Sequence, residues 1–389
     1  PGGITHFIAH SIKEIYLMNS KERVFAAFKK GPGLPGTPAE GSPPDRVPFQ
    51  FDLCKSLTEH FGKKLGITPK YTLSYYEDLT YRISANDIRT KMGSDCVVVG
   101  GQVAKNFTPQ AVRDDIITNE FGMHMKPTSL YVEVVKCPLD GAESVEDVEA
   151  YAFPDPYAPG RTEDAKRDID RFGKDYFVIG DCELSLFELA WHLTGLENYM
   201  VNMASEEDWI EALNDKVEYF TTGIAEQLVH AGVDAIWFGE DLGTQVSTLI
   251  SPDMWRKIFR PRHERIIKKI RAINPNILVI MHSDGAVAPL LDDFIDMGID
   301  IYNPVQPNVP GSDPKELKDK YGSRICFFGG LDQQRLMPEG DLKKIEADMR
   351  NRATILGKNG GYLMAPAHII QADVTPETVE GVLGILKTL

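Results

Sequence analysis

From residue 176 onward the sequence repeats one pattern, a short apolar stretch followed by a longer stretch with helical periodicity. The apolar stretches are uninterrupted and rich in β-branched residues, which is typical of parallel strands buried on both faces. We expect such strands at Tyr176–Asp181, Ala235–Phe238, Ile277–Met281, Ile299–Asn303, Ile325–Phe328 and Gly361–Ala365. Helical patterns at 205–231, 252–273 and 341–356 separate several of them, so the chain predicts an α/β fold with helical connections between parallel strands.

Two further stretches, near 46–52 and 95–101, bring the number of expected strands to eight. No Gly-rich dinucleotide fingerprint follows any of them, which favours a (β/α)8 TIM barrel over a doubly wound sheet. Residues 1–44 are expected to form an N-terminal extension, with a helix over 20–30 capped by Ser20 and a Gly/Pro-rich loop from Gly31 to Pro44. Residues 45–389 are expected to form the barrel, with an insertion over 108–160 that contains a β-hairpin, because 108–142 alternates in polarity.

Charge and cysteine content limit the partners and the compartment. The net charge of −15 argues against a nucleic-acid or anionic-membrane partner, because both are polyanions. No apolar run approaches the roughly 20 residues that span a bilayer. The five cysteines are scattered without a CxxC pair, which predicts reduced thiols in a cytoplasmic protein. The opening Pro-Gly-Gly is unusual for a native start, and Met18 is a reasonable alternative.

Polar side chains follow the strand ends, where the catalytic groups of a β/α barrel lie. His282 and Asp284 come directly after the stretch 277–281, and their spacing of two puts both side chains on one side of an extended chain. The other polar residues at strand ends are Asp52, Asp181, Glu183, Glu240, Asp241, Asn303, Gln306, Asp332, Gln333, His368 and Gln371. Each alone is better explained as a helix cap or loop anchor, but caps do not require histidines and paired acids together.

Glu240 and Asp241 are adjacent carboxylates, which repel each other unless a cation or a shared proton relieves them. A histidine with two or three carboxylates suits zinc with an open position for substrate, and such a zinc polarises a bound oxygen. We therefore expect His282, Asp284 and Glu240 as metal ligands, and these three with Asp241 as catalytic residues. The alternative, an acid/base pair or a capping Asp with a hydrogen-bonded His, stays open on the spacing alone.

Six motifs together resemble the uroporphyrinogen decarboxylase superfamily. They are Phe238-Gly-Glu-Asp-Leu-Gly-Thr-Gln245, Ile250-Ser-Pro, His282-Ser-Asp-Gly285, Asn303-Pro-Val-Gln306, Phe328-Gly-Gly-Leu-Asp332 and Ile370-Gln-Ala-Asp-Val-Thr-Pro-Glu377. The resemblance implies a TIM barrel. The decarboxylases of this superfamily carry an Arg-Gln-Ala-Gly-Arg segment that grips porphyrin carboxylates. Here that region is the Gly/Pro loop and Arg46-Val-Pro, so porphyrinogen decarboxylation is not favoured.

The sequence is more similar to the corrinoid-dependent methyltransferase branch, which includes the O-demethylase methyltransferase I enzymes. Members that methylate coenzyme M ligate zinc through His-x-Cys and a later Cys, whereas this chain has His282-Ser-Asp284 and, at the later position, Ala367. The resemblance, with both thiolates replaced, implies demethylation of a methoxylated small molecule such as an aryl methyl ether. It also implies substrate contacts from Asn303, Gln306, His368 and Gln371. Phe238 and Tyr302 are expected either to pack on an aryl ring or to belong to the barrel core.

The corrinoid-binding signature Asp-x-His-x-x-Gly occurs at none of the nine histidines. The resemblance therefore implies that cobalamin comes on a separate corrinoid protein docking at the barrel mouth. Two alternatives stay open: a decarboxylase of the same superfamily, and a non-catalytic protein of this fold that binds a corrinoid or a substrate. The oligomeric state, a homodimer included, also stays open.

Overall fold

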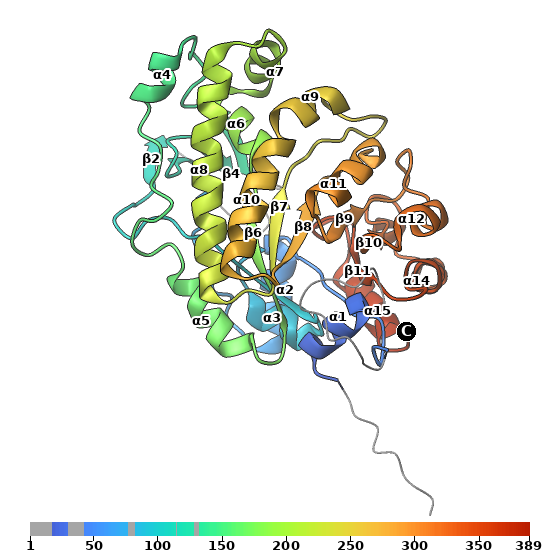
Figure 1. Ribbon diagram of the computed structural model, residues 1–389. Coiled ribbons are helices and arrows are strands. Elements are labelled where there is room, and N and C mark those ends of the chain that lie inside the picture. The colour runs from blue at the N-terminus through green and yellow to red at the C-terminus, as the bar shows by residue number, and fades with distance from the viewer. Residues whose placement is uncertain (1–17, 30–42, 77–81, 114, 128–131) are drawn as a thin grey trace, which may run out of the picture.

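The computed structural model describes residues 18–29, 43–76, 82–113, 115–127 and 132–389. Residues 1–17 and the expected Gly/Pro-rich loop, apart from Pro43 and Pro44, lie outside this description. Within it, the fold centres on a curled parallel sheet in the order β1-β6-β7-β8-β9-β10-β11 (Figure 1). The strands are β1 (Cys96–Gly100), β6 (Phe177–Cys182), β7 (Ala235–Gly239), β8 (Leu278–His282), β9 (Ile301–Val305), β10 (Cys326–Leu331) and β11 (Tyr362–Pro366).

The eighth position of the barrel is filled by an extended segment over 49–53. Phe49 forms a parallel bridge with Met364 of β11, and Leu53 forms one with Ile370. On its other side the segment contacts the start of β1, where the Asp95 amide donates to the Phe49 carbonyl at 2.7 Å. The expected strand at 46–52 is thus present only as isolated bridges. Proline at position 48 has no N–H, and the Asp95 side chain takes the Phe49 N–H at 2.9 Å, so a regular ladder cannot form here.

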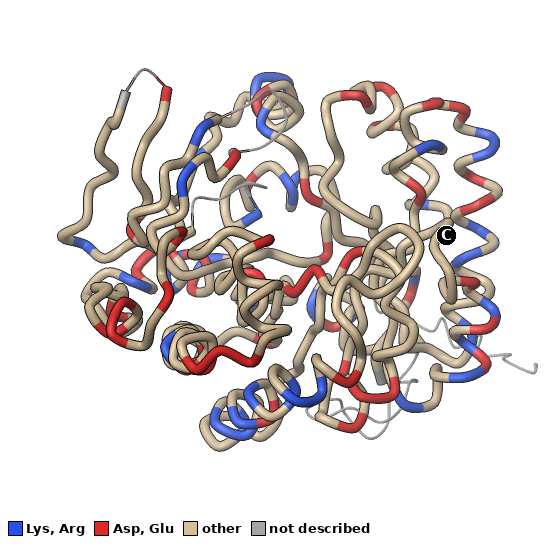
Figure 2. The backbone as a smooth tube through the Cα atoms, turned by 90° about the horizontal axis from the view of Figure 1, so that it is seen from above, with Lys and Arg blue, Asp and Glu red and all other residues tan. Residues whose placement is uncertain are grey.

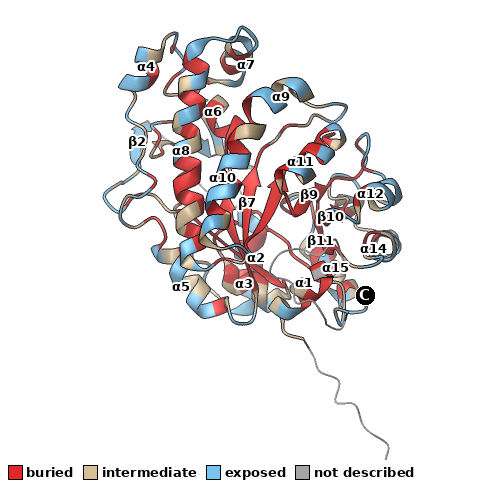
Figure 3. Cartoon of the chain, in the orientation of Figure 1, coloured by how far each residue is buried: buried red, intermediate tan, exposed pale blue. Residues whose placement is uncertain are grey.

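Helices cover the outside of the sheet. In chain order these helices are α2 (Lys55–Leu65), α3 (Asn86–Met92), α5 (Glu163–Phe172), α6 (Phe187–Thr194), α7 (Leu196–Ala204), α8 (Asp208–Ala231), α9 (Pro252–Ile258), α10 (Arg260–Ile273), α11 (Leu291–Met297), α12 (Pro314–Tyr321), α13 (Leu336–Glu339), α14 (Leu342–Leu356) and α15 (Pro376–Leu386), with a 3-10 turn at Ala288–Leu290. Their inner faces are buried with the strands, and their outer faces are exposed (Figure 3). Acidic and basic residues are interspersed over this outer layer (Figure 2). The single helix expected over 252–273 is divided, because Pro261 opens α10 and cannot continue the hydrogen bonding of α9.

Helix α1 (Ser20–Lys29) lies at the end of the barrel where the strands begin (Figure 1). Its residues Val24 and Phe28 belong to the same buried cluster as the inward-facing residues of the strands, so the helix closes the barrel floor. The helix is capped by Asn19, whose Oδ1 accepts the Glu22 N–H at 2.8 Å while its own N–H donates to the Glu22 carboxylate at 3.0 Å. The prediction of Ser20 as the cap is wrong by one residue.

The insertion after β1 forms a second, antiparallel sheet in the order β2-β3-β4-β5, from β2 (Gln110–Arg113), β3 (Ile116–Thr118), β4 (His124–Pro127) and β5 (Val132–Lys136). The expected hairpin is one part of this sheet. The short helix α4 (Val145–Ala150) follows, and the ring of Phe121 packs on Phe220 of α8 with ring centroids 5.0 Å apart. In the described residues no helix combines the length and the apolarity that a membrane crossing requires.

Candidate functional site

The inner face of the barrel is identified by alternate residues of each strand. Ala235 and Trp237 of β7, and Leu278 and Ile280 of β8, belong to the inner buried cluster, whereas the residues between them pack outward against the helices. His282 continues the inner row of β8, because side chains on one face of a strand recur every second residue. The inner row therefore changes from apolar to polar at the carboxyl end of the sheet, where a barrel has its functional mouth.

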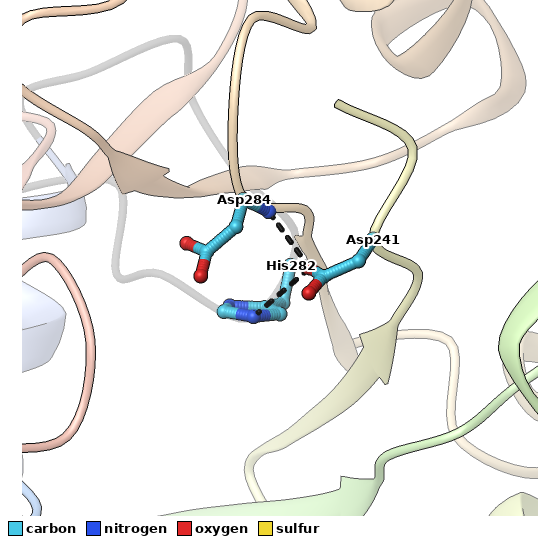
Figure 4. A group of neighbouring side chains, drawn as sticks. All are labelled: Asp241, His282 and Asp284. Atoms are coloured by element: carbon cyan, nitrogen blue, oxygen red, sulfur yellow. Dashed lines mark hydrogen bonds and ion pairs between the residues drawn. The ribbon is translucent and has the colours of Figure 1, made fainter. Parts of the chain in front are cut away.

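Three side chains from two neighbouring strand ends meet at this mouth: Asp241, His282 and Asp284 (Figure 4). Each offers one ligand atom, and these atoms lie within 4.8 Å of one another. His282 Nε2 is 3.7 Å from Asp241 Oδ1, which also accepts the Asp284 N–H at 2.9 Å. The His282 side chain is 5% exposed, whereas those of Asp241 and Asp284 are 45% and 26% exposed. The group, which we call the mouth triad, can thus be reached from solvent on its carboxylate side.

The geometry of His282 suits a metal ligand. Its Nδ1 is paired with Asn303 Oδ1 at 2.6 Å, so Nδ1–H donates and Nε2 is left with its lone pair toward the carboxylates. Metal-binding histidines are typically fixed in this way through their second nitrogen. One imidazole nitrogen and two carboxylates match zinc with an open coordination position, and no sulfur atom belongs to the triad. The residues present therefore fit zinc.

Behind His282 lies a buried stack that fixes its ring. The indole of Trp237 lies against the imidazole, with centroids 5.0 Å apart and planes inclined by 22°. The Arg82 guanidinium lies over the same indole, 4.6 Å from its centroid, and pairs with the Glu183 carboxylate. Glu183 Oε2 also accepts the Trp237 Nε1–H at 2.9 Å, while Glu183 Oε1 lies 4.0 Å from His282 Nε2. This stack leaves little freedom for the ring of His282.

Carboxylates dominate the electrostatics of the mouth. Burial acts to lower the pKa of His282, but Glu183, Asp284 and Asp241 outweigh it and raise that pKa above its ordinary value. Burial, with the neighbouring Asp241, raises the pKa of Asp284, while His368 and His282 act against this. Burial also acts to raise the pKa of Glu183, but Arg82 and His282 outweigh it and lower that pKa. A surplus of negative charge therefore surrounds His282, and a bound cation would relieve it.

Glu240 does not join the triad, although it was expected as a metal ligand. Its side chain points outward and is buried, and its carboxylate accepts the N–H groups of Leu186 at 2.6 Å and Phe187 at 2.8 Å. His263 Nε2 of α10 lies 3.1 Å from Glu240 Oε1. Glu240 thus satisfies the free N–H groups at the start of α6 and links that helix to α10, which is a structural role.

Phe238 and Tyr302, expected to pack on an aryl ring, also face outward. Both belong to the core between the strands and the helices, and the ring of Phe238 contacts His263 at a centroid distance of 5.7 Å. Each is the neighbour of an inward-facing residue, Trp237 or Asn303, and successive residues of a strand face opposite sides. Phe238 and Tyr302 therefore cannot face the substrate. The aromatic ring beside His282 is therefore that of Trp237.

A pocket of about 260 Å³, which we call the mouth pocket, opens beside the triad and shares Asp284 with it. It is lined mainly by amides and carboxylates: Gln245, Asp284, Gln306, Pro307, Asp332, Gln333, Gln334, Ala367, His368, Gln371 and Asp373. Of the expected substrate-binding residues, it brings together Gln306, His368 and Gln371. His368 Nε2 lies 3.9 Å from Asp284 Oδ2 across this pocket.

Two glycines bring the loops that carry the triad into direct backbone contact. A Cβ on Gly243 would lie 2.4 Å from the Asp284 carbonyl oxygen. Gly285 has a φ of +85°, a left-handed conformation, and a Cβ there would lie 2.5 Å from the Gly243 carbonyl carbon. The spacing between Asp241 and Asp284 therefore depends on both glycines.

Comparison with known families matches residues 116–389 to the model for uroporphyrinogen decarboxylase (URO-D). The chain belongs to the uroporphyrinogen decarboxylase family. The matched part contains β6 to β11 and the whole mouth triad, whereas Arg82 and the segment 49–53 precede it. Among curated proteins no match was found.

Among solved structures, a methyltransferase from Methanosarcina mazei is similar over 95% of this chain and 99% of that chain, with a TM-score of 0.68 and 17% sequence identity. A B12-independent methionine synthase from Shewanella sp. W3-18-1 is similar over 77% of this chain and 82% of that chain, with a TM-score of 0.40 and 12% identity. The first likeness agrees with the barrel fold of the uroporphyrinogen decarboxylase family along nearly the whole chain.

Arg82 and Trp237 belong to the site but were not predicted from the sequence, and Glu183 had no predicted role. Trp237 could have been found, because it stands two residues after the inward-facing Ala235 and two before Gly239 on the same strand. Arg82 carries no such signal, since it lies outside the barrel strands and reaches the site through a connecting segment.

Proposed function

We propose that this chain is a methyltransferase that takes a methyl group from a methoxylated small molecule, with aryl methyl ethers as the favoured class. The methyl acceptor is the cobalt of a corrinoid carried by a separate protein. Membership of the uroporphyrinogen decarboxylase family and the fold shared with the Methanosarcina mazei methyltransferase support this proposal.

The observation that carries the proposal is the composition of the mouth triad. Two carboxylates and one imidazole converge at the barrel mouth, beside a pocket that shares Asp284. The cysteines lie elsewhere: Cys54, Cys96, Cys182 and Cys326 are buried and Cys137 is in the segment after β5. A site without thiolates and rich in oxygen ligands favours an ether oxygen over a thiol as the group to be activated.

The residues then have distinct tasks. His282 Nε2, Asp241 and Asp284 would hold zinc, which when bound supplies a positive charge that polarises the ether oxygen. Asn303 and Trp237 fix the His282 ring. The C–O bond breaks with its electron pair left on oxygen, and the methyl group passes to the corrinoid. His368 Nε2, at the pocket wall, gives a proton to the departing oxygen.

Decarboxylation of a polycarboxylate has less support. Arg46 pairs with Asp95 at 2.7 and 2.9 Å, at the end of the barrel where β1 begins and away from the mouth. Arg82 pairs with Glu183 inside the barrel, and none of the described residues that line the mouth pocket is a lysine or an arginine. A substrate with several carboxylates would find no cationic partner in that pocket.

An anaerobic transfer assay tests the proposal. The zinc-loaded protein, a methoxylated phenol and a reduced corrinoid protein are expected to give the demethylated phenol and the methylated corrinoid in equal amounts. Absence of corrinoid methylation across a panel of methoxylated compounds, with zinc bound, would overturn the proposal.

A further inference from the structure

We infer that the mouth pocket binds a methyl donor that carries a hydroxyl group and no acidic substituent. This inference rests on the proposed function and names the chemical class of its substrate. It is carried by one unpaired side chain in the pocket and by the charges around that side chain.

The unpaired side chain is Gln371, on the loop after β11. Both its Nε2 and its Oε1 are buried and have no hydrogen-bond partner within the protein. Leaving a buried polar atom unpaired costs free energy, so each such atom in a native structure calls for a ligand or a water to pair it. Gln371 lines the pocket that shares Asp284 with the mouth triad. Its amide is therefore the group that a ligand in this pocket would pair.

The other amides whose partners are known hold the pocket together. Gln306 Oε1 accepts the Gly285 N–H at 2.6 Å, and Gln306 Nε2 donates to Gln245 Oε1 at 3.2 Å. Gln333 Oε1 accepts the His368 N–H at 3.2 Å. These bonds join residues of the site to one another, whereas the side-chain amide of Gln371 has no partner within the protein. Gln371 thus differs from Gln306 and Gln333 in having both its donor and its acceptor still to offer.

A hydroxyl group satisfies both atoms of the amide, because it accepts from Nε2 and donates to Oε1. An ionised carboxylate only accepts, so it would leave Oε1 unpaired whichever way the amide is turned. A methoxy oxygen has the same limitation, since it has no proton to donate. The amide of Gln371 therefore selects for a hydroxyl in addition to the methyl ether.

The charges at the pocket also favour a neutral ligand over an anionic one. Its wall includes the carboxylates of Asp284, Asp332 and Asp373, and its described lining contains no lysine or arginine. Asp332 is fixed, because its Oδ2 accepts from Asn308 Nδ2 at 2.7 Å and its Oδ1 accepts two backbone N–H groups at 3.0 Å. Zinc in the mouth triad would offset Asp284 but leave Asp332 and Asp373 without a counter-charge, so an anionic substituent on their side of the pocket is disfavoured.

Binding calorimetry with matched ligands on the zinc-loaded wild type tests the inference. The first pair differs in charge and has similar size: neutral 4-hydroxy-3-methoxybenzyl alcohol and anionic 4-hydroxy-3-methoxybenzoate. The hydroxyl pair is 2-methoxyphenol against 1,2-dimethoxybenzene. We expect the alcohol to bind at least about tenfold more tightly than the benzoate, and the phenol about tenfold more tightly than the dimethoxy compound. Equal affinities within either pair, or no binding of the two hydroxylated neutral compounds, would overturn the inference.

The variant Gln371→Leu connects the preference to its residue. It is expected to remove the preference within the hydroxyl pair and to leave the free energy of unfolding unchanged or higher, because it removes two unpaired buried atoms. Gln110→Leu changes an exposed glutamine of β2 that does not line the pocket, so it serves as the matched control and should keep the preference. A Gln371→Leu protein that keeps the hydroxyl preference, or that is clearly destabilised without ligand, would contradict the assignment.

Methyl transfer from the same four compounds separates the two proposals. Transfer from all four compounds at equal rates would support the proposed function and overturn the inference. Selective binding without any transfer would support the inferred ligand class and overturn the proposed function.

Discussion

Two neighbouring carboxylates at the end of β7, Glu240 and Asp241, enter opposite environments. Glu240 points outward, is completely buried, and has its oxygens occupied by backbone N–H groups, with His263 Nε2 3.1 Å from Oε1. Asp241 points into the barrel mouth, is 45% exposed, and lies 3.7 Å from His282. Both groups pair a carboxylate with a histidine, but only the second keeps ligand atoms free and open to solvent. Two adjacent carboxylates thus have different roles: Glu240 anchors a helix, and Asp241 belongs to a candidate metal site.

Removing the imidazole of the mouth triad has the largest expected effect. His282→Ala should lower methyl transfer by about a thousandfold, because losing a metal that stabilises the leaving oxygen raises the barrier by roughly 4 kcal/mol. The protein should stay folded at the assay temperature, although the loss of this buried, hydrogen-bonded ring lowers the thermal unfolding midpoint. Turnover close to that of the wild type, measured with a reduced corrinoid protein, would contradict the role of His282.

The two neighbours can be compared directly by changing each carboxylate to its amide. Glu240→Gln should lower the free energy of unfolding by about 3–4 kcal/mol, because it disrupts a buried, hydrogen-bonded charge at the start of α6. Asp241→Asn should change it by less than about 1 kcal/mol, because the side chain is half exposed. Urea unfolding of both variants gives the result. Equal losses of stability would remove the distinction between the two carboxylates.

The helix that Glu240 anchors, α6, contains a buried histidine that predicts a pH dependence of stability. Burial lowers the pKa of His192, on α6, to about 4. The unfolded chain takes up this proton near pH 6.5, so between about pH 6.5 and 4 unfolding is coupled to protonation and stability falls as the pH falls. From pH 7 to pH 4.5 the wild type should lose roughly 2–3 kcal/mol more than His192→Gln. The free energies of unfolding of the two proteins at both pH values check this, and parallel losses would refute it.

The smallest effect is expected at the contact between the two loops of the triad. A methyl group at Gly243 would collide with the Asp284 carbonyl oxygen, which is backbone and can yield only if the loop moves. Gly243→Ala should therefore weaken zinc binding about tenfold and lower the free energy of unfolding by about 1–2 kcal/mol. Zinc titration of the variant would show whether the spacing between Asp241 and Asp284 depends on this contact. Unchanged zinc affinity would mean that it does not.

The sequence pattern predicted the barrel well, because seven of its strands coincide with apolar stretches that can be recognised from local composition alone. It failed at the segment 49–53, where Pro48 and the side chain of Asp95 replace regular ladder bonds. In the site, the spacing of two residues placed His282 and Asp284 correctly on one side. The same alternation, applied to β7, would have turned Glu240 and Phe238 outward and Trp237 inward.

Other parts of the site depend on contacts that local sequence does not encode. The position of Arg82 over Trp237 joins residues far apart in the chain. The unpaired state of Gln371 depends on which neighbouring amides have already found partners, and this is a property of the folded loops. Such features need the tertiary structure, because residue type and spacing do not determine them.

Zinc titration by calorimetry tests the central claim, that Asp241, His282 and Asp284 together hold a metal ion. The metal-free wild type should bind one zinc ion per chain, and so should Asp253→Asn, which changes a carboxylate that is 94% exposed on α9. His282→Ala and Asp284→Asn should each bind zinc at least about 100-fold more weakly. Zinc binding by either of these variants with the affinity of the wild type, or no zinc binding by the wild type, would contradict the account.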